Sequence, residues 1–314
     1  MPSKKKKHPT WITCQHCGTR RLCYGKSYCS IACSKEAQAA YRLATNGHHL
    51  PPVASILSAL PSTQAPLTEV HPWLYIESRD LFITNDWHLP IHSTYWATRL
   101  IELGVQAEGK ADLAINGDFF DFDIAKITRH DGYKREHSIQ HSIVAGSNML
   151  RILLSVFSNV YMDCGNHDDR FTKAFAPLHF SDLMDMICRK IGDASSRLRW
   201  TMRNYCFLND DWVIVHPVNY SVARLKVASE YADHFKRHCI TGHEHHPCGY
   251  TMNKTNDYIA ANCGAMIDKK ACAYNTMKVN PKYPEWANGI ARIKDGDLVL
   301  YDERTNWGKV LYGK

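Results

Sequence analysis

The stretch Ala111-Asp-Leu-Ala-Ile-Asn-Gly-Asp-Phe-Phe-Asp121 decides the fold class of this 314-residue chain. Its first half is short and mostly apolar, as a buried strand would be, and Gly117 then permits a sharp turn into two carboxylates. Residues 93–108, just before it, have the spacing of an amphipathic helix that opens with Ser and Thr and stops at Gly109. A helix followed by a strand that ends in polar residues indicates an α/β fold.

Short apolar runs alternate with longer amphipathic stretches from Trp73 onward, so we expect one α/β domain over residues 73–314. The other expected strands are Asp80–Asn85, Val160–Cys164, Trp212–Val215, Cys239–Thr241 and Tyr258–Ala261. The other expected helices are His137–Phe157, Ser181–Ile191 and Val222–Arg237. Two alternating runs around Asp295-Gly296 predict a final hairpin within Ile290–Tyr301.

Residues that can bind metals follow five of the expected strands. They are Asp86-Trp-His88, Gly117-Asp118-Phe-Phe-Asp121, Gly165-Asn166-His167-Asp168, His216 and Gly242-His243-Glu-His245. The carboxyl ends of the strands gather along one edge of an open α/β sheet, so we expect these blocks to converge. Their carboxylate, imidazole and amide groups suit divalent Mn, Fe or Zn. The chain has 18 histidines, and one alone is more often a surface or core residue than a ligand, so the prediction depends on the five blocks together.

These blocks resemble the motifs of the calcineurin-like metallophosphoesterases, which are D-x-H, G-D-x-x-D, G-N-H followed by D or E, a single H, and G-H-x-H, in that order. The resemblance covers roughly residues 80–265. It implies an α/β fold of the metallophosphoesterase type, a β-sandwich flanked by helices. It also implies a hydrolase with two divalent metal ions, Mn foremost, with Fe, Zn and Ni as alternatives. Such a pair binds phosphate oxygens and lowers the pKa of a shared water, which attacks the ester as a metal-bridged hydroxide.

The resemblance also implies a role for each matching residue. One metal would be held by Asp86, His88, Asp118 and His245, and the second by Asp118, Asn166, His216 and His243, with Asp118 bridging. His167 would be the general acid that protonates the leaving oxygen. Asp121 and Asp168 would orient His167 and the metal ligands, although Asp121 could instead be only a cap for the segment after it.

Two departures from the family's protein serine/threonine phosphatases bear on the substrate. Those enzymes carry Arg-Gly after the G-D-x-x-D block and Glu after Asn-His, whereas here Phe122-Asp123 follows Asp121, and Asp168 follows Asn-His. The resemblance is therefore closer to the nuclease and phosphodiesterase branches. Arg129 and Arg170 lie near the motifs and could contact phosphate, although exposed arginines usually have no such role.

Five of the twelve cysteines lie between Cys14 and Cys33 and predict a separate N-terminal module. The cysteines at 14, 17, 29 and 33 form C-x2-C and C-x3-C pairs, a spacing that can enclose one tetrahedral structural zinc ion. The expected ligands are Cys14, Cys17, Cys29 and Cys33. We expect a treble-clef-like zinc module with its basic arm over residues 1–45, in which Cys23 or His16 could replace a ligand. Residues 46–72, rich in Pro, Ser, Thr and Ala, are predicted to be a linker.

Nearly all the excess positive charge lies in the same N-terminal part. The net charge is +7, and the first 50 residues contain nine Lys and Arg residues and one acidic residue, Glu36. This asymmetry predicts contact with the phosphates of a nucleic acid. The residues expected to make it are Lys4, Lys5, Lys6, Lys7, Arg20 and Arg21. The alternatives are a solvated basic tail, and a zinc module that binds protein or stabilises the terminus.

We therefore expect a metal-dependent phosphodiesterase, specifically a nuclease positioned on DNA or RNA by its zinc module. The alternative is a phosphomonoesterase or small-nucleotide phosphodiesterase with a structural zinc module. A non-catalytic nucleic-acid-binding protein should have lost metal ligands, and the motifs retain all of theirs. The composition, 45% hydrophobic and 22% charged, excludes wholesale disorder. The absence of a signal-peptide core, of an apolar run near ~20 residues and of secretion features around the cysteines predicts a cytoplasmic protein without membrane association.

Overall fold

The computed structural model describes residues 10–13, 20–23, 73–122, 138–174, 179–271 and 285–313. The chain divides into two units, Met1–Ala65 and Pro66–Lys314. In the first unit, strands β1 (Thr10–Thr13) and β2 (Arg20–Cys23) form an antiparallel pair. Arg20 and Arg21 lie on β2. The four expected zinc ligands, Lys4–Lys7 and the expected linker all lie outside the described residues, so these remain predictions.

The second unit contains two six-stranded mixed sheets. The first sheet has the order β14 (Asp297–Asp302), β13 (Gly289–Lys294), β4 (Asp80–Asn85), β5 (Asp112–Asn116), β6 (Val160–Asp163) and β7 (Leu198–Trp200). The second has the order β11 (Gly249–Met252), β12 (Ile259–Asn262), β10 (His238–Thr241), β9 (Trp212–Val215), β8 (Tyr205–Leu208) and β3 (Tyr75–Ile76). Strands β4 to β7 run parallel, as do β9, β10 and β12. The expected α/β class is confirmed.

The two sheets pack face to face through a shared apolar core. Ile83 and Ala114 of the first sheet belong to the same buried cluster as Ile214 and Ala261 of the second. Because β4, β5 and β9 are also covered on their outer faces, they are buried on both sides, which explains their nearly continuous apolar sequences.

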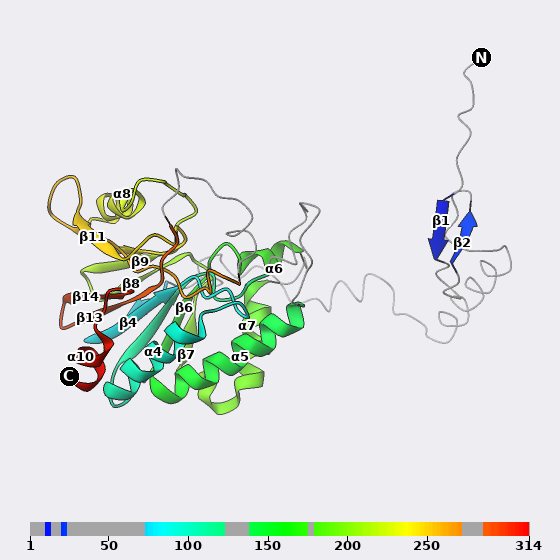
Figure 1. The fold of residues 1–314 in the computed structure, drawn as a ribbon, viewed down its shortest axis with the longest axis horizontal. Coiled ribbons are helices and arrows are strands. Elements are labelled where there is room, and N and C mark those ends of the chain that lie inside the picture. Colours follow the sequence, from blue (N-terminus) through cyan, green and yellow to red (C-terminus); the bar gives the residue numbers. More distant parts are fainter. Residues whose placement is uncertain are drawn as a thin grey trace, which may run out of the picture. The chain divides into compact units, whose positions relative to one another are not determined.

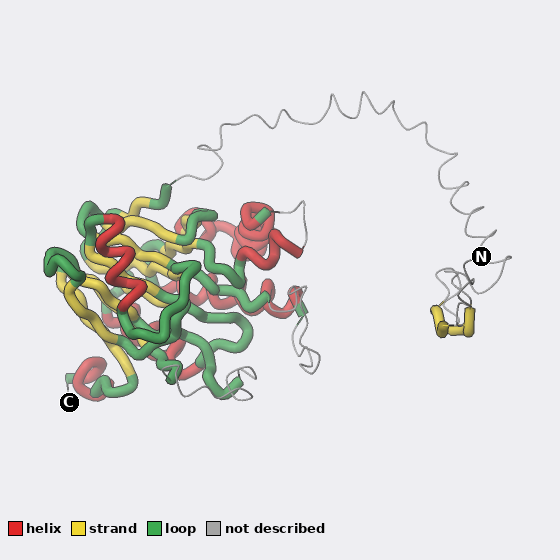
Figure 2. Tube along the Cα trace, turned by 90° about the horizontal axis from the view of Figure 1, so that it is seen from above, coloured by secondary structure: helices red, strands yellow, loops and turns green. Residues whose placement is uncertain are grey.

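Helices cover the outer face of each sheet, so the unit has four layers (Figure 1). Helices α4 (Thr94–Gln106), α5 (Ile139–Val156) and α7 (Phe180–Ile191) pack on the first sheet. Helix α8 (Lys226–Phe235) lies across the second sheet, as Figure 2 shows from above. The shorter helical elements are α6 (Asp169–Ala174), the 3-10 helix η2 (Gly192–Arg197) and α10 (Trp307–Tyr312). None of the helices in these ranges is long and apolar enough to cross a membrane.

Most expected elements are present, with shifted ends. The strands expected at 80–85 and 212–215 have the predicted bounds, and α4 begins after Ser93, whose hydroxyl accepts the Trp96 N–H. Helix α8 is shorter than the expected Val222–Arg237, because Leu225 has a left-handed backbone and the helix can begin only after it. The expected hairpin is present as β13 and β14, joined at Asp295-Gly296. Strands β7, β8 and β11 were not predicted.

Candidate metal centre

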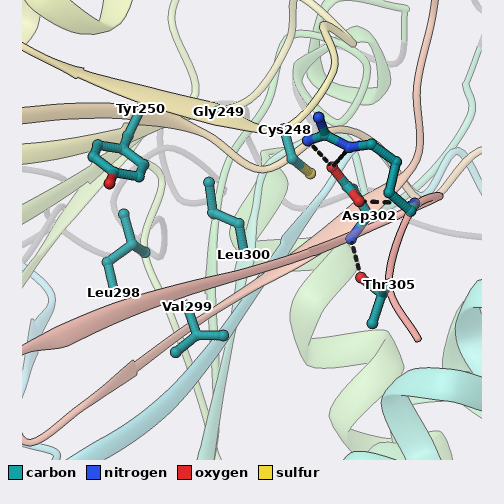
Figure 3. A pocket seen from close by; sticks show the side chains of 9 residues that line it. Cys248, Gly249, Tyr250, Leu298, Val299, Leu300, Asp302 and Thr305 are labelled. Carbon is teal, nitrogen blue, oxygen red and sulfur yellow. Dashed lines mark hydrogen bonds and ion pairs between the residues drawn. The ribbon is translucent and has the colours of Figure 1, made fainter. Parts of the chain in front are cut away.

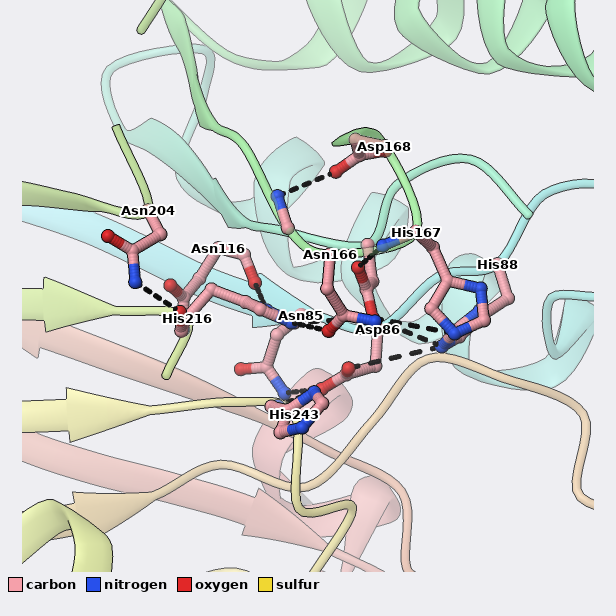
Figure 4. A network of polar contacts seen from close by, with 12 residues as sticks. Asn85, Asp86, His88, Asn116, Asn166, His167, Asp168, Asn204, His216 and His243 are labelled. Carbon is pink, nitrogen blue, oxygen red and sulfur yellow. Dashed lines mark hydrogen bonds and ion pairs between the residues drawn. The ribbon is translucent and has the colours of Figure 1, made fainter. Parts of the chain in front are cut away.

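The residue blocks after the strands converge, as the sequence predicts. The blocks follow β4, β5 and β6 of the first sheet and β9 and β10 of the second, and their side chains point into one polar network (Figure 4). Three overlapping triads within it could hold metal ions, since the candidate ligand atoms of each lie within 4.8 Å of one another. They are Asp86, His88 and His245; His88, Asp118 and His167; and Asp118, His216 and His243.

The first triad brings together two ligand atoms that lack hydrogen bonds. Asp86 Oδ1 lies 3.0 Å from His245 Nε2 and 3.9 Å from His88 Nε2. Both Asp86 Oδ1 and His88 Nε2 are buried and have no hydrogen-bond partner among the described residues. A buried carboxylate oxygen and imidazole nitrogen in this state are unfavourable unless something else binds them. A divalent cation between them would satisfy both, so the residues present fit a metal ion.

The second triad is arranged around His216, which is held from behind by the backbone. Its Nδ1 donates to the carbonyl oxygen of Asn116 at 3.0 Å, so Nε2 is the nitrogen that faces the centre. Nε2 lies 3.3 Å from Asp118 Oδ2 and 3.3 Å from Asn166 Oδ1. An unprotonated nitrogen facing two oxygens is repelled by them unless a cation lies between. His243, the third member, donates its backbone N–H to Asp86 Oδ2 at 2.8 Å.

Asp118 joins the triads. Its Oδ2 lies 3.3 Å from His216 Nε2, 3.9 Å from His88 Nε2 and 4.0 Å from His167 Nε2. Its Oδ1 accepts the His167 backbone N–H at 2.7 Å, which orients the carboxylate. The same oxygen therefore faces histidines of both the first and the second triad, as a bridging ligand must. Asn166 is within reach of the second group, and the seven residues expected to bind metal are all brought together.

The titration behaviour of the cluster has the pattern expected of a cation site. Burial opposes the charged forms of Asp86 and Asp118, but the facing His245 and His216, respectively, outweigh it and hold both carboxyl pKa values below their usual range. For His88 and His216, burial alone would lower the pKa, yet the neighbouring Asp121 and Asp118 raise it to about 9 and about 10. The carboxylates thus attract positive charge strongly, and protons and divalent cations compete for the same place.

The backbone at the centre is strained in a consistent way. Five candidate ligands have positive φ angles without being glycine: Asp86 (54°), His88 (49°), Asp118 (49°), His243 (69°) and His245 (53°). Left-handed backbone is unfavourable for residues with a Cβ and gathers at functional sites. Each ligand ends a turn that leaves the strand sharply, which is what allows side chains from both sheets to reach the same point. The sequence gives no direct signal of these angles.

Two glycines expected to leave room at the turns do so. Gly117 has φ +64°, and a Cβ placed on it would lie 2.4 Å from the His216 ring. A Cβ on Gly165 would lie 2.2 Å from the backbone nitrogen of Asp118. Larger residues at these positions would displace the ligands themselves.

His167 and Asp121 form a pair beside the triads. His167 Nδ1 lies 2.9 Å from Asp121 Oδ1, and the same carboxylate lies 3.6 Å from His88 Nδ1. Burial lowers the pKa of His167, while the nearby carboxylates oppose this effect. The predicted pairing of Asp121 with His167 is therefore present in the geometry. The third triad includes His167, so its position suits a ligand as well as an acid.

Asp168 acts on the backbone and does not touch the His167 ring in any contact that the structure gives. It is fully buried and accepts N–H groups from Phe120 (2.9 Å), Gly165 (2.9 Å) and Phe119 (3.4 Å). Burial, with the nearby Asp118, raises its pKa to about 7. It thereby ties the loop after β5 to the loop after β6, and it orients the ligands through those loops.

Sequence reasoning missed several buried polar residues around the centre. Asn85 Nδ2 donates to Asp86 Oδ2 at 2.9 Å, and Asn116 supplies the carbonyl that holds His216. Glu244, between two candidate ligands, is fully buried, and its Oε1 accepts the Ser221 N–H at 3.1 Å, which ties the loop after His216 to the turn. The available signal was a polar residue closing an otherwise apolar strand, as in Asn85 and Asn116.

A separate hollow between β11 and β14 carries no such chemistry (Figure 3). Its lining residues are Cys248, Gly249, Tyr250, Leu298, Val299, Leu300, Asp302, Arg304 and Thr305. None of them belongs to a metal triad, and the Asp302 carboxylate is paired with Arg304.

A scan against models of known protein families gives no match for this chain, and a search of curated proteins finds no similar protein. The structure itself establishes an α/β protein with buried His and Asp clusters that could bind metals.

Proposed function

We propose that this chain is a dinuclear-metal phosphodiesterase, a nuclease of the calcineurin-like metallophosphoesterase type. One observation carries the proposal: Asp118 Oδ2 lies within 4.0 Å of histidine Nε2 atoms on both sides, 3.3 Å from His216 and 3.9 Å from His88. A carboxylate oxygen shared by two donor groups is the arrangement that places two ions close enough to act on one phosphate.

The residues divide into two ligand sets around Asp118. The first set would be Asp86, His88, His245 and Asp118, and the second Asp118, Asn166, His216 and His243. When bound, two divalent ions supply positive charge to the phosphate oxygens and activate a water for attack. Mixed oxygen and nitrogen donors suit Mn, Fe, Zn or Ni, and we propose Mn.

His167 would give a proton to the leaving oxygen, with Asp121 as its positioning residue. Burial lowers the pKa of the imidazole, which makes its protonated form a stronger acid. The Asp121 carboxylate, 2.9 Å from Nδ1, stabilises that protonated form and turns Nε2 toward the centre. Asp168 would keep the two loops that carry Asp118 and His167 at a fixed separation.

The nucleic-acid substrate is supported by the sequence of the N-terminal part. Four consecutive lysines and a four-cysteine pattern precede a site whose chemistry suits phosphate esters. A polycationic arm binds a polymer of phosphates by releasing its counterions, a contribution that a small ester does not gain.

The experiment compares polymer and small substrates with one preparation of the full chain. The protein is incubated with Mn and then with EDTA on end-labelled single- and double-stranded DNA and RNA, with bis-p-nitrophenyl phosphate as the small diester. We expect EDTA-sensitive cleavage of a polymer. Asp118→Asn should abolish it, whereas His234→Ala, an exposed histidine on α8, should not.

A variant with Lys4, Lys5, Lys6 and Lys7 changed to Ser tests the arm. It should reduce the slope of log KM for the polymer against log salt by up to about 4 and leave the small diester unaffected. Cleavage of the small diester alone would move the substrate to nucleotides and demote the arm to a structural part. Hydrolysis of neither, with metal bound, would refute the enzymatic proposal.

A further inference from the structure

Arg170 brings a fixed positive charge to the edge of the metal centre. It lies in α6, which begins directly after Asp168, and its backbone N–H donates to the His167 carbonyl at 3.2 Å. Its side chain is half-buried, and Nη1 lies 2.6 Å from His167 Nδ1. Among the described residues, it is the arginine that the structure places against a side chain of the three triads.

The same ring nitrogen also faces a carboxylate. His167 Nδ1 lies 2.9 Å from Asp121 Oδ1. Donation to Asp121 requires a hydrogen on Nδ1, whereas acceptance from Arg170 requires that Nδ1 carry none, so one nitrogen cannot serve both at once. In the tautomer that suits Asp121, the guanidinium Nη1 faces an N–H and needs an acceptor elsewhere.

We propose that Arg170 binds a non-bridging oxygen of the substrate's phosphoryl group and is a specificity residue for anionic phosphate. The inference rests on the proposed function, because it takes the phosphate to be held beside His167. A phosphate that presents its leaving oxygen to His167 brings other oxygens of the same phosphorus to this side of the ring. A planar guanidinium fork matches phosphate oxygens in geometry and charge. The adjacent Phe122 is fully buried and apolar, so Arg170 is the group here that can meet the anion.

The test measures binding of inorganic phosphate to the full chain loaded with metal, by titration calorimetry. Arg170→Met should weaken phosphate binding about 10- to 100-fold, the usual range for a lost charged hydrogen bond. Arg170→Lys should retain part of the affinity, because it keeps the charge and loses the fork. The matched control is Arg199→Met, an exposed arginine on β7. It should bind phosphate like the unmodified chain.

Two further readouts separate a phosphate contact from a structural role. Metal content, measured by mass spectrometry, should be equal in all variants, and added guanidinium should restore part of the activity of Arg170→Ala. Equal phosphate affinity in Arg170→Met and Arg199→Met would overturn the inference, as would loss of metal together with loss of phosphate binding. If the unmodified chain binds phosphate through Arg170 yet hydrolyses no ester, the proposed function fails while the contact stands.

Discussion

Replacing Gly117 with Ala should move His216, and the size of the effect can be worked out from a matched glycine elsewhere. Gly117 has φ +64°, and its added Cβ would lie 2.4 Å from the His216 ring. Gly192 has φ +77°, and a Cβ there meets nothing within 4 Å. The left-handed backbone should therefore cost each alanine variant about 1–2 kcal/mol of unfolding free energy. Gly117→Ala should lose about 1–3 kcal/mol more, because the methyl group enters a packed site.

The second expected effect concerns metal affinity. His216 is held by the Asn116 carbonyl, and a shifted ring would lose that hydrogen bond and its aim at Asp118. Disturbing such a support typically weakens metal binding about 10- to 100-fold. Urea unfolding of the metal-free chain and calorimetric titration with Mn measure the two effects. If Gly117→Ala binds metal as tightly as Gly192→Ala does, His216 is not a ligand held by this packing, and the reasoning is wrong.

Two other predictions concern ligands and pH. Asp118→Ala should lose both metals, whereas His167→Ala should keep both and lose rate. Metal analysis of the two variants checks this, and equal metal loss would contradict the division of roles. The raised pKa values of His88 and His216, about 9 and about 10, stabilise the metal-free fold fully below the unfolded value of 6.5. This contribution should be lost as pH rises from 6.5 through 9 to 10, while Mn affinity rises over the same range because bound metal displaces the protons. Urea unfolding and Mn titration at several pH values measure both trends, and a metal-free stability that is flat over this range would contradict the charge assignment.

The sequence predicts the elements that are buried on both sides better than it predicts the others. Strand β4 is a nearly continuous apolar run that ends in Asn85, and its bounds are those expected. Strand β11 could not be found this way, because its residues are mostly exposed and it pairs only along one edge. Its position depends on β12, which is distant information that no local pattern contains.

The candidate site could be predicted because its ligands stand at strand ends. The order of the strands in a sheet then brings the blocks together whatever the loops do. The supports could not be predicted in the same way. Asp168 looks like a partner of the neighbouring His167, but it binds backbone N–H groups of Phe120 and Gly165 instead. That choice depends on how two loops approach each other, which only the folded chain decides.

The backbone angles give an argument for function that is independent of any motif. At a left-handed position glycine is favoured over other residues by about 1 kcal/mol or more, with Asn and Asp the least disfavoured. His88, His243 and His245 all have φ angles between 49° and 69°, and histidine gains nothing from this conformation by itself. Three such residues within one buried cluster are unfavourable for stability alone, because glycine at each position would relieve the strain. Their side chains must therefore contribute something that glycine cannot, and unpaired imidazole nitrogen facing a buried carboxylate is suited to binding a cation.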